Sequence, residues 1–441
     1  MPVIEQLAEF VATADPSRLP QLDRDIQRRH LADTLVARIA GAASHEGHLL
    51  ARLERPSAET AAGIASLAAS VRATEIDDIH IGSCTTVSSV AVPVALGLAA
   101  RGGATPDRLL GAMWAGTELA IRLAQAIDGA RVLYQGVWPT RTAAPLASAA
   151  VAARMLGLSG QETAHALSLA LMMTPSRIGK FTGEPTGRWI VFMATVGDGI
   201  RAAEAARAGF KSDLVLLDGP WLEKMIGVPV DMAKLTRGLG ETSVYPELSL
   251  KPFCTSRQAL SATEAMRQLL ANGLDPAGIE GITVRVPSAY AAMISTKLDP
   301  AVRATSYVSA GAQMAIAAFQ SAHLYDVDRA TVLGDTRIQK LAALVQVEAD
   351  PAMDEDFPRR WPAEVEVRAA GGVHKLRVDE PPGDPGKRLD DPALAVKAKA
   401  VMAHVGSGER ASGLLDLAGR ATTDPAAVKT LADVFVNGGH A

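Results

Sequence analysis

Hydrophobic positions along most of the chain repeat every three to four residues, which predicts a mainly helical protein. The clearest example begins after Pro20, where Leu22, Ile26, Leu31, Leu35 and Ile39 form an apolar stripe that ends near Gly41. The same periodicity predicts further helices over residues 1–15, 87–99, 107–127, 143–156, 161–172 and 258–271. The alanine-rich segment 143–156 predicts a helix that other helices can approach closely.

The pattern changes at Asn272-Gly273. Beyond this point apolar and polar residues alternate, which predicts strands over 281–287, 345–348, 364–368 and 374–378, with helical patterns over 306–320 and 336–344. The tail from Pro392 to Val436 is again helical in pattern. We therefore expect a helical domain over residues 1–271, completed by 392–441, and a smaller α+β domain over 272–391. Residues 220–246 are rich in helix breakers and should be irregular.

The composition of the chain argues against some classes of function. The chain has 441 residues with a net charge of −4 and no basic block, so nucleic acid is not an expected partner. No apolar run is long enough to span a membrane. Two cysteines, Cys84 and Cys254, do not make a disulfide framework and favour a reducing compartment. We expect a cytoplasmic protein whose partner is a small-molecule substrate.

One loop gathers cations among helix breakers. Gly179, Gly183, Pro185 and Gly187 surround Lys180, Glu184 and Arg188, and an apolar run and a helical pattern ending at Gly209 follow. A cationic loop that leads into a helix can hold an anionic ligand near the helix N-terminus. The alternative is a surface loop between two helices.

A polar cluster over residues 75–86 contains Asp77, Asp78 and His80. Paired carboxylates beside an imidazole suit proton transfer, because like charges raise one carboxyl pKa and histidine titrates near neutrality. The alternative is structural, with Thr85 or Thr86 capping the helix that follows. His30, His45 and His48 have no carboxylate or cysteine framing them, so we expect no metal site.

Several segments together resemble the MmgE/PrpD family, which includes 2-methylcitrate dehydratase, cis-aconitate decarboxylase and iminodisuccinate epimerase. The resemblance runs in order from about residue 20 to 270, and it is carried by the segments Leu31–Leu35, Val92–Leu96, Trp138–Leu158, Gly183–Phe210 and Lys251–Phe253. It implies an all-helical domain with a smaller α+β lid, a homodimer, and chemistry that needs no cofactor.

The resemblance also shows departures. Where the family carries histidine, this chain has Thr86, Trp138 and Ile190, and Gly187 replaces a lysine. Gln313 falls near a position that is usually arginine, histidine or tyrosine. Losing imidazoles and an ammonium makes the pocket more apolar, so we expect a less anionic substrate than a tricarboxylate.

Two functions follow. The first is a lyase or isomerase in which Asp78 or His80, beside Asp77, moves a proton next to a carboxylate or carbonyl, with Tyr134 or Cys254 as the second acid. The side chains expected to contact substrate are Thr86, Trp138, Lys180, Arg188, Lys251, Arg257 and Gln313. The second is a non-catalytic homologue that binds a ligand or a partner.

Overall fold

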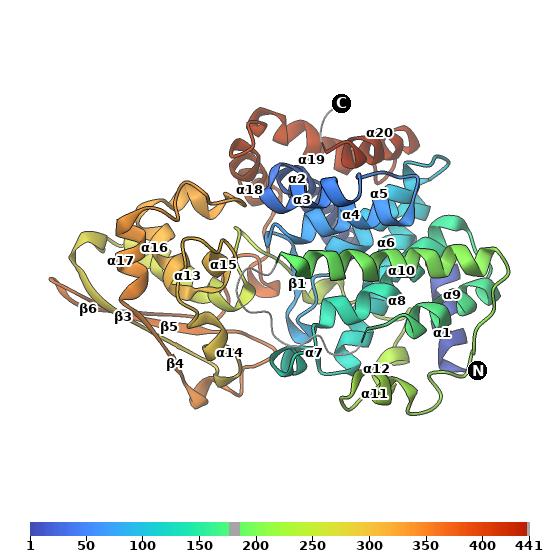
Figure 1. Cartoon of the computed structure of the whole chain (residues 1–441), viewed down its shortest axis with the longest axis horizontal. Helices are drawn as coiled ribbons and strands as arrows, with labels where there is room; N and C mark the ends of the chain where they lie inside the picture. The colour runs from blue at the N-terminus through green and yellow to red at the C-terminus, as the bar shows by residue number, and fades with distance from the viewer. Residues whose placement is uncertain (176–185, 439–441) are drawn as a thin grey trace.

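The computed structural model describes residues 1–175 and 186–438, and within these ranges the prediction of a mainly helical protein is confirmed. Figure 1 shows a helical part on the right, an α+β part on the left, and the last three helices across the top. Within those ranges, no helix is long and apolar enough to cross a membrane.

The helical part is built from helices whose apolar faces form one continuous core. Its longer helices are α1 (Val3–Thr13), α2 (Gln21–Ala43), α3 (His45–Leu53), α4 (Ala61–Arg72), α5 (Ser88–Ala99), α6 (Pro106–Ala126), α8 (Pro139–Leu156), α9 (Gly160–Met172), α10 (Gly187–Arg207), α18 (Asp391–Ala403), α19 (Ala411–Arg420) and α20 (Pro425–Val436). Its short helices are α7 (Gly129–Val132), α11 (Trp221–Ile226) and α12 (Ala233–Thr236).

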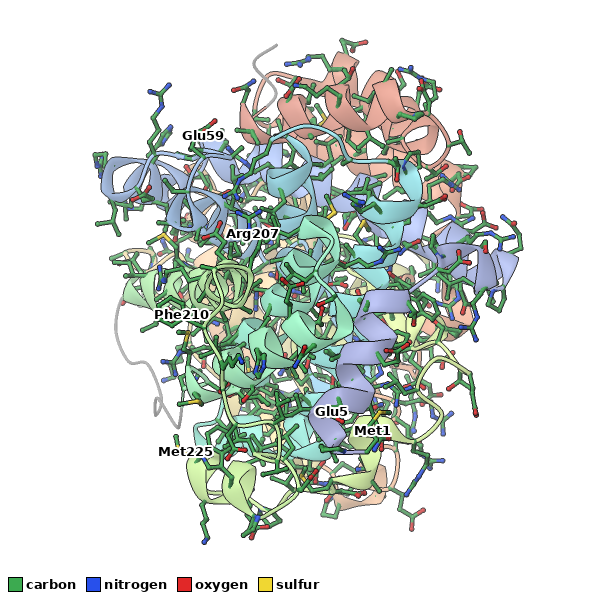
Figure 2. The ribbon with its side chains drawn as sticks, turned by 90° about the vertical axis from the view of Figure 1, so that its right-hand side faces the viewer. Met1, Glu5, Glu59, Arg207, Phe210 and Met225 are labelled. Atoms are coloured by element: carbon green, nitrogen blue, oxygen red, sulfur yellow. The ribbon has the colours of Figure 1, made fainter. Side chains whose placement is uncertain are left out.

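Helix α8 is the centre of this part and packs against α5, α6, α9 and α10. Glycines on its neighbours allow the close approach that its small side chains predict. A Cβ at Gly116 of α6 would lie 2.3 Å from Val151, and one at Gly199 of α10 would lie 2.2 Å from the Pro145 carbonyl oxygen. Figure 2 views α10 nearly end-on, with Phe210 at the surface just beyond the end of this helix.

The α+β part has its own apolar core between a four-stranded sheet and the helices beside it. The strand order is β4 (Val345–Ala349), β3 (Ile279–Val286), β5 (Ala363–Ala369) and β6 (Gly372–Val378), and β3 and β4 are parallel. The helices are α13 (Arg257–Ala271), α14 (Ser288–Ile294), α15 (Thr305–Val308), α16 (Ala310–Phe319) and α17 (Thr336–Ala343). Helix α13 belongs to this core, although it precedes residue 272.

A second, two-stranded sheet joins distant segments at the site described below. β1 (Asp78–His80) runs antiparallel to β2 (Leu248–Leu250), with Asp78 opposite Leu250. This pairing brings residues 72–77 at the end of α4 next to Lys251, which follows β2.

Among the differences between predicted and observed elements, three concern α8, the pair α15 and α16, and the segment 220–246. Helix α8 begins at Pro139 rather than at 143, because proline is well suited to the first helical turn. The predicted helix 306–320 is divided into α15 and α16 at Ser309, whose hydroxyl accepts a hydrogen bond from the Ala312 amide and caps α16. The segment 220–246 is not wholly irregular, since it contains α11 and α12.

Candidate active site

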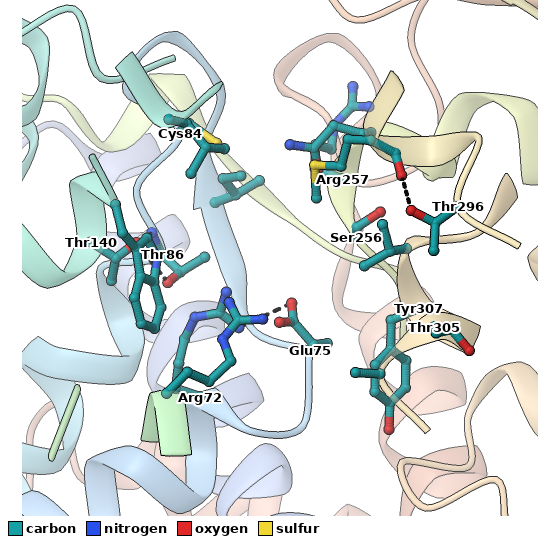
Figure 3. Close-up of a pocket in the computed structure, with 18 of the residues that line it drawn as sticks. Arg72, Glu75, Cys84, Thr86, Thr140, Ser256, Arg257, Thr296, Thr305 and Tyr307 are labelled. Carbon is teal, nitrogen blue, oxygen red and sulfur yellow. Dashed lines mark hydrogen bonds and ion pairs between the residues drawn. The ribbon is translucent and has the colours of Figure 1, made fainter. Parts of the chain in front are cut away.

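A cavity of about 680 Å³ lies between residues of the helical part and residues of the α+β part. Figure 3 shows Arg72, Glu75, Thr86 and Thr140 on one wall and Tyr307 on the other. The first wall comes from the end of α4, the segment up to Thr86, and the N-terminal ends of α8 and α10; the second comes from α13, α14 and α15. The volume suits a small organic molecule.

Two cations and two carboxylates form a buried cluster at this cavity. Arg72 Nη1 lies 3.0 Å from Glu75 Oε2 and 3.5 Å from Asp77 Oδ1. Lys251 Nζ lies 3.3 Å from Glu75 Oε2 and 3.2 Å from Asp77 Oδ1. Arg72, Glu75 and Lys251 line the cavity, whereas Asp77 lies behind them and is 2% exposed. The two cations hold both carboxylates in place, and Glu75 is the one that reaches the cavity.

The backbone at Glu75 adopts an unusual conformation. Its φ is +54°, a left-handed value that costs a non-glycine residue about 1 kcal/mol or more. The Glu75 carbonyl compensates by accepting hydrogen bonds from the Thr255 amide and from Lys251 Nζ. These contacts fix the carboxylate at the edge of the cavity.

The two carboxylates of the cluster have pKa values shifted in opposite directions. Burial alone would raise the pKa of Glu75, but Arg72, Lys251 and Arg188 outweigh it and lower the value to about 2. Burial raises the pKa of Asp77 despite Arg72 and Lys251, and its Oδ2 has no hydrogen-bond partner among the described residues. A charged carboxylate beside one that favours its protonated form is an arrangement that supports proton transfer.

Two indole rings form the apolar surface of the first wall. Trp138 and Trp189 both line the cavity, with ring centroids 6.3 Å apart. The guanidinium of Arg188 lies 4.8 Å from the Trp138 ring and 4.6 Å from the Trp189 ring, and that of Arg72 lies 5.9 and 5.6 Å from the same rings. Burial lowers the pKa of Arg188 to about 10, which still leaves it charged at neutral pH. The wall therefore combines an edge-to-face pair of aromatic rings, inclined at 72°, with a cation.

The remaining charged groups of the lining, and Tyr134, have partners within the protein. Arg257 pairs with Asp384, and Arg303 pairs with Glu46. The Tyr134 hydroxyl accepts a hydrogen bond of 3.0 Å from Gln258 Nε2, and burial raises the Tyr134 pKa well above its usual value. Tyr134 thus keeps its proton and can act as a hydrogen-bond or proton donor.

Seven of the residues predicted from the sequence are brought to the cavity or directly behind it. They are Tyr134, Thr86, Trp138, Arg188, Lys251 and Arg257 in the lining, and Asp77 in the second layer. Thr86 hydrogen-bonds through its amide to the Thr140 hydroxyl at 3.1 Å. Lys180 lies outside the described residues.

The structure does not bring Asp78 and His80 to the cavity. Successive side chains of β1 point to opposite faces, so Ile79 lines the cavity while Asp78 and His80 face away. Asp78 accepts hydrogen bonds from the Ser88 amide and hydroxyl at the start of α5 and lies 3.2 Å from His30 Nδ1. His80 Nε2 lies 2.8 Å from Glu247 Oε2. The contacts of Asp78 are those of a helix cap, and neither side chain lines the cavity.

Cys254 and Gln313 also lie outside the lining. Cys254 is buried, its thiol donates to the Thr74 carbonyl, and burial raises its pKa to about 11, so it is a poor nucleophile or acid at neutral pH. Gln313 Nε2 donates to the carbonyls of Cys254 and Ser306. Gln313 thus links the loop after β2 to the segment around α15 and α16, whereas the Cys254 thiol links that loop to the residues that follow α4.

Four charged lining residues were not selected from the sequence: Arg72, Glu75, Glu46 and Arg303. The sequence could have indicated Arg72 and Glu75, because a spacing of three residues at the end of a helix brings opposite charges together, here directly before Asp77. For Glu46 and Arg303 there was no such signal, because their pairing depends on tertiary contact across 257 positions.

Comparisons with known proteins agree with this architecture. Residues 49–228 match the family model for the MmgE/PrpD N-terminal domain, and residues 253–418 match the model for the MmgE/PrpD C-terminal domain. No curated protein matches the chain. Together the two models cover most of the sequence and most of the cavity lining, with Glu46 and Lys251 outside the matched ranges.

Proposed function

The chain belongs to the MmgE/PrpD family, which indicates a dehydratase or lyase type of function, and from this premise we propose that it catalyses proton abstraction and donation on a small monocarboxylate. The observation that carries this proposal is the charge balance of the cavity. The substrate of the proposed lyase or isomerase would have one carboxylate and an apolar or unsaturated body.

The charge balance follows from which cations already have partners. The carboxylates of the chain neutralise most of the lining cations: Glu75 and Asp77 pair with Arg72 and Lys251, Asp384 with Arg257, and Glu46 with Arg303. Among the described residues, no carboxylate lies within ion-pair distance of Arg188, and its Nε has no hydrogen-bond partner. Of the lining cations that the structure describes, Arg188 is thus left to bind one carboxylate, whereas a tricarboxylate would need more.

The shape of the site supports the same class of substrate. A carboxylate on Arg188 would place the rest of the molecule against the indoles of Trp138 and Trp189. A conjugated or hydrophobic body gains from stacking there, whereas a second or third carboxylate would lose its hydration against the rings.

Proton transfer would then use Glu75 and Tyr134. Glu75 is the carboxylate of the cluster that lines the cavity, and we assign it as the base. Arg188 is one of the cations that lower its pKa, so a substrate anion bound to Arg188 would raise that pKa and strengthen the base. Arg72 and Lys251 lie where they can stabilise negative charge that develops on the substrate, and the protonated Tyr134 can return a proton to a leaving group or to the opposite face.

The test is proton exchange followed by NMR in deuterium oxide. The purified protein would be incubated with monocarboxylates that bear apolar or unsaturated groups, and with cis-aconitate, 2-methylcitrate and iminodisuccinate. We expect deuterium uptake or new olefin signals with a monocarboxylate, and a loss of about 10²–10⁴-fold in rate in Glu75→Gln. Turnover of the polyanions alone would refute the proposed substrate class.

Glu46→Gln is the matched control. It removes the same charge from the same cavity, but its partner is Arg303 rather than the proposed catalytic cluster. This variant should retain turnover and, because Arg303 is released, should bind dicarboxylates better than the wild type does.

The alternative is a non-catalytic homologue, and one observation favours it: a carboxylate with a pKa of about 2 is a weak base until the field around it changes. In that case none of the compounds would exchange protons, and monocarboxylates would still raise the melting temperature of the wild type but not of Arg188→Met.

A further inference from the structure

Three potential metal ligands from distant segments meet away from the cavity. His323 lies in the 3₁₀ turn Ser321–Leu324 and Asp326 follows that turn, while His404 directly follows α18. One ligand atom from each of the three lies within 4.8 Å of the others, and among the described residues no other such group occurs. We propose that these residues form a zinc site.

The distances fit a tetrahedral ion. His323 Nδ1 lies 3.2 Å from Asp326 Oδ2, and the rings of His323 and His404 have centroids 5.0 Å apart. Zinc bonds of about 2.0–2.1 Å in tetrahedral geometry place neighbouring ligand atoms roughly 3.3 Å apart. The His323–Asp326 pair already has this spacing, and His404 needs only a small approach to complete a three-ligand site with water in the fourth position.

Hydrogen bonds outside the cluster fix the tautomer of His404 and leave one oxygen of Asp326 available. His404 Nε2 lies 2.9 Å from the Ala322 carbonyl oxygen, so this nitrogen carries the proton and donates it, which leaves the lone pair on Nδ1 for a metal. The Asp326 Oδ1 atom accepts a hydrogen bond of 2.9 Å from the Asp328 amide, which leaves Oδ2 toward His323. A backbone carbonyl that fixes the histidine tautomer is the usual support of a zinc ligand.

The ligand types favour zinc over harder cations. Two imidazoles and one carboxylate form a nitrogen-rich set that suits zinc, whereas magnesium and calcium take mainly oxygen ligands. Both cysteines of the chain, Cys84 and Cys254, are buried elsewhere, so no thiolate competes with this site.

The position of the site gives it a structural consequence. Helix α18 packs on α2 of the helical part, while the 321–324 turn follows α16 in the α+β part. A zinc ion held by both would cross-link the two parts that form the walls of the cavity. The site is separate from the proposed acid–base residues, so its test needs no enzymatic activity.

The experiment uses the full chain, stripped of metal and titrated with Zn²⁺ against a chromophoric chelator, with metal content per chain measured after gel filtration. We expect about one zinc per wild-type chain and an affinity at least about tenfold weaker in His404→Gln. At free zinc a hundredfold above the dissociation constant, the melting temperature of the wild type should rise by about 3 °C, and that of His404→Gln should not.

The matched control is His48→Gln, which removes an exposed histidine on α3 outside this cluster. His404 is also exposed, so neither substitution should disturb folding, and the metal-free melting temperatures of both variants check this. Cobalt(II) in place of zinc gives a visible spectrum that reports tetrahedral nitrogen and oxygen ligands. A wild type without saturable zinc, or equal losses in both variants, would overturn the proposal.

Discussion

Two arginines on the same aromatic wall should respond in opposite ways to the same substitution. Arg72 and Arg188 both lie over Trp138 and Trp189, but Arg72 is ion-paired with Glu75 and Asp77, whereas Arg188 has no carboxylate partner among the described residues. Methionine keeps an apolar stem against the indoles and removes the charge. We predict that Arg188→Met stabilises the ligand-free protein and that Arg72→Met destabilises it.

The size of the stability change in Arg188→Met follows from the free-energy cost of burying an unpaired charge. Lowering its pKa to about 10 corresponds to a destabilisation on the order of 3 kcal/mol, and partial exposure of the side chain reduces this to about 2 kcal/mol. Loss of the cation–π contacts offsets roughly 1 kcal/mol of the gain. The net stabilisation in Arg188→Met is therefore about 1 kcal/mol.

Arg72→Met should change the free energy of unfolding in the opposite direction. Removing one partner of a buried ion pair leaves uncompensated charge and costs about 3–5 kcal/mol. For a cooperative unit of 441 residues, the unfolding entropy is about 0.9 kcal/mol per kelvin. Arg188→Met should therefore melt about 1 °C above the wild type, and Arg72→Met about 3–5 °C below it.

Thermal and urea unfolding of the three proteins at pH 7 and 9 would measure both effects. The folded-state pKa of Arg188 is lowered, so the cost of its charge is fully present below pH 10 and shrinks only above that value. The gain in Arg188→Met should thus be equal at the two pH values, while the same variant binds a monocarboxylate about 10–150-fold more weakly. If Arg188→Met loses stability as Arg72→Met does, Arg188 is a structural cation and the substrate assignment is wrong.

Three further predictions concern the surroundings of the site. Asp78→Asn removes the charged acceptor of the Ser88 amide, so it should lower the free energy of unfolding by about 1–3 kcal/mol in urea titrations. Its kcat should stay within about threefold of the wild type. A large loss of kcat would instead identify Asp78 as the base. Because the pKa of Glu75 is lowered to about 2, the contribution of its charged form to stability is complete above about pH 4.5 and is lost as the pH falls toward 2. The stability of Glu75→Gln should therefore depend less on pH in this window than the stability of the wild type does. Gly199→Ala would place a Cβ 2.2 Å from the Pro145 carbonyl oxygen and should cost about 1–3 kcal/mol in the same titrations, and an unchanged stability would show that α8 and α10 can separate.

Helices and strands were predictable from the sequence because their signals are local. The strand predicted over 364–368 is β5 at Ala363–Ala369, and the helix predicted over 161–172 is α9, whose capping box at Ser159 and Glu162 lies in the predicted turn. The break at Ser309 was missed because the apolar period continues through it and only the side-chain cap interrupts the helix.

The candidate site was predictable only in part because its geometry depends on a short sheet. The three residues of β2 follow Glu247 and carry no strand pattern of useful length, yet their pairing with β1 determines which side chains reach the cavity. Without that strand, Asp77, Asp78 and His80 are an undivided polar cluster. With it, the two-residue period of a strand turns Asp78 and His80 away from the cavity and leaves Asp77 with Lys251.

The same dependence explains why the charge preference of this site cannot be read from its cations alone. The cations that line the cavity would suit a polyanion if they were unpaired. Carboxylates from separate segments, among them Glu46 on α3 and Asp384 before α18, neutralise these cations by ion pairing. Each such ion pair removes one positive charge that a carboxylate of the ligand would otherwise have to neutralise. Arg188→Met and Glu46→Gln change this balance in opposite directions, so the first should abolish selection for an anion and the second should extend it to dianions. A competition assay with one monocarboxylate and one dicarboxylate against all three proteins would measure whether ligand charge follows the number of unpaired cations, as this balance requires, or is set elsewhere in the cavity.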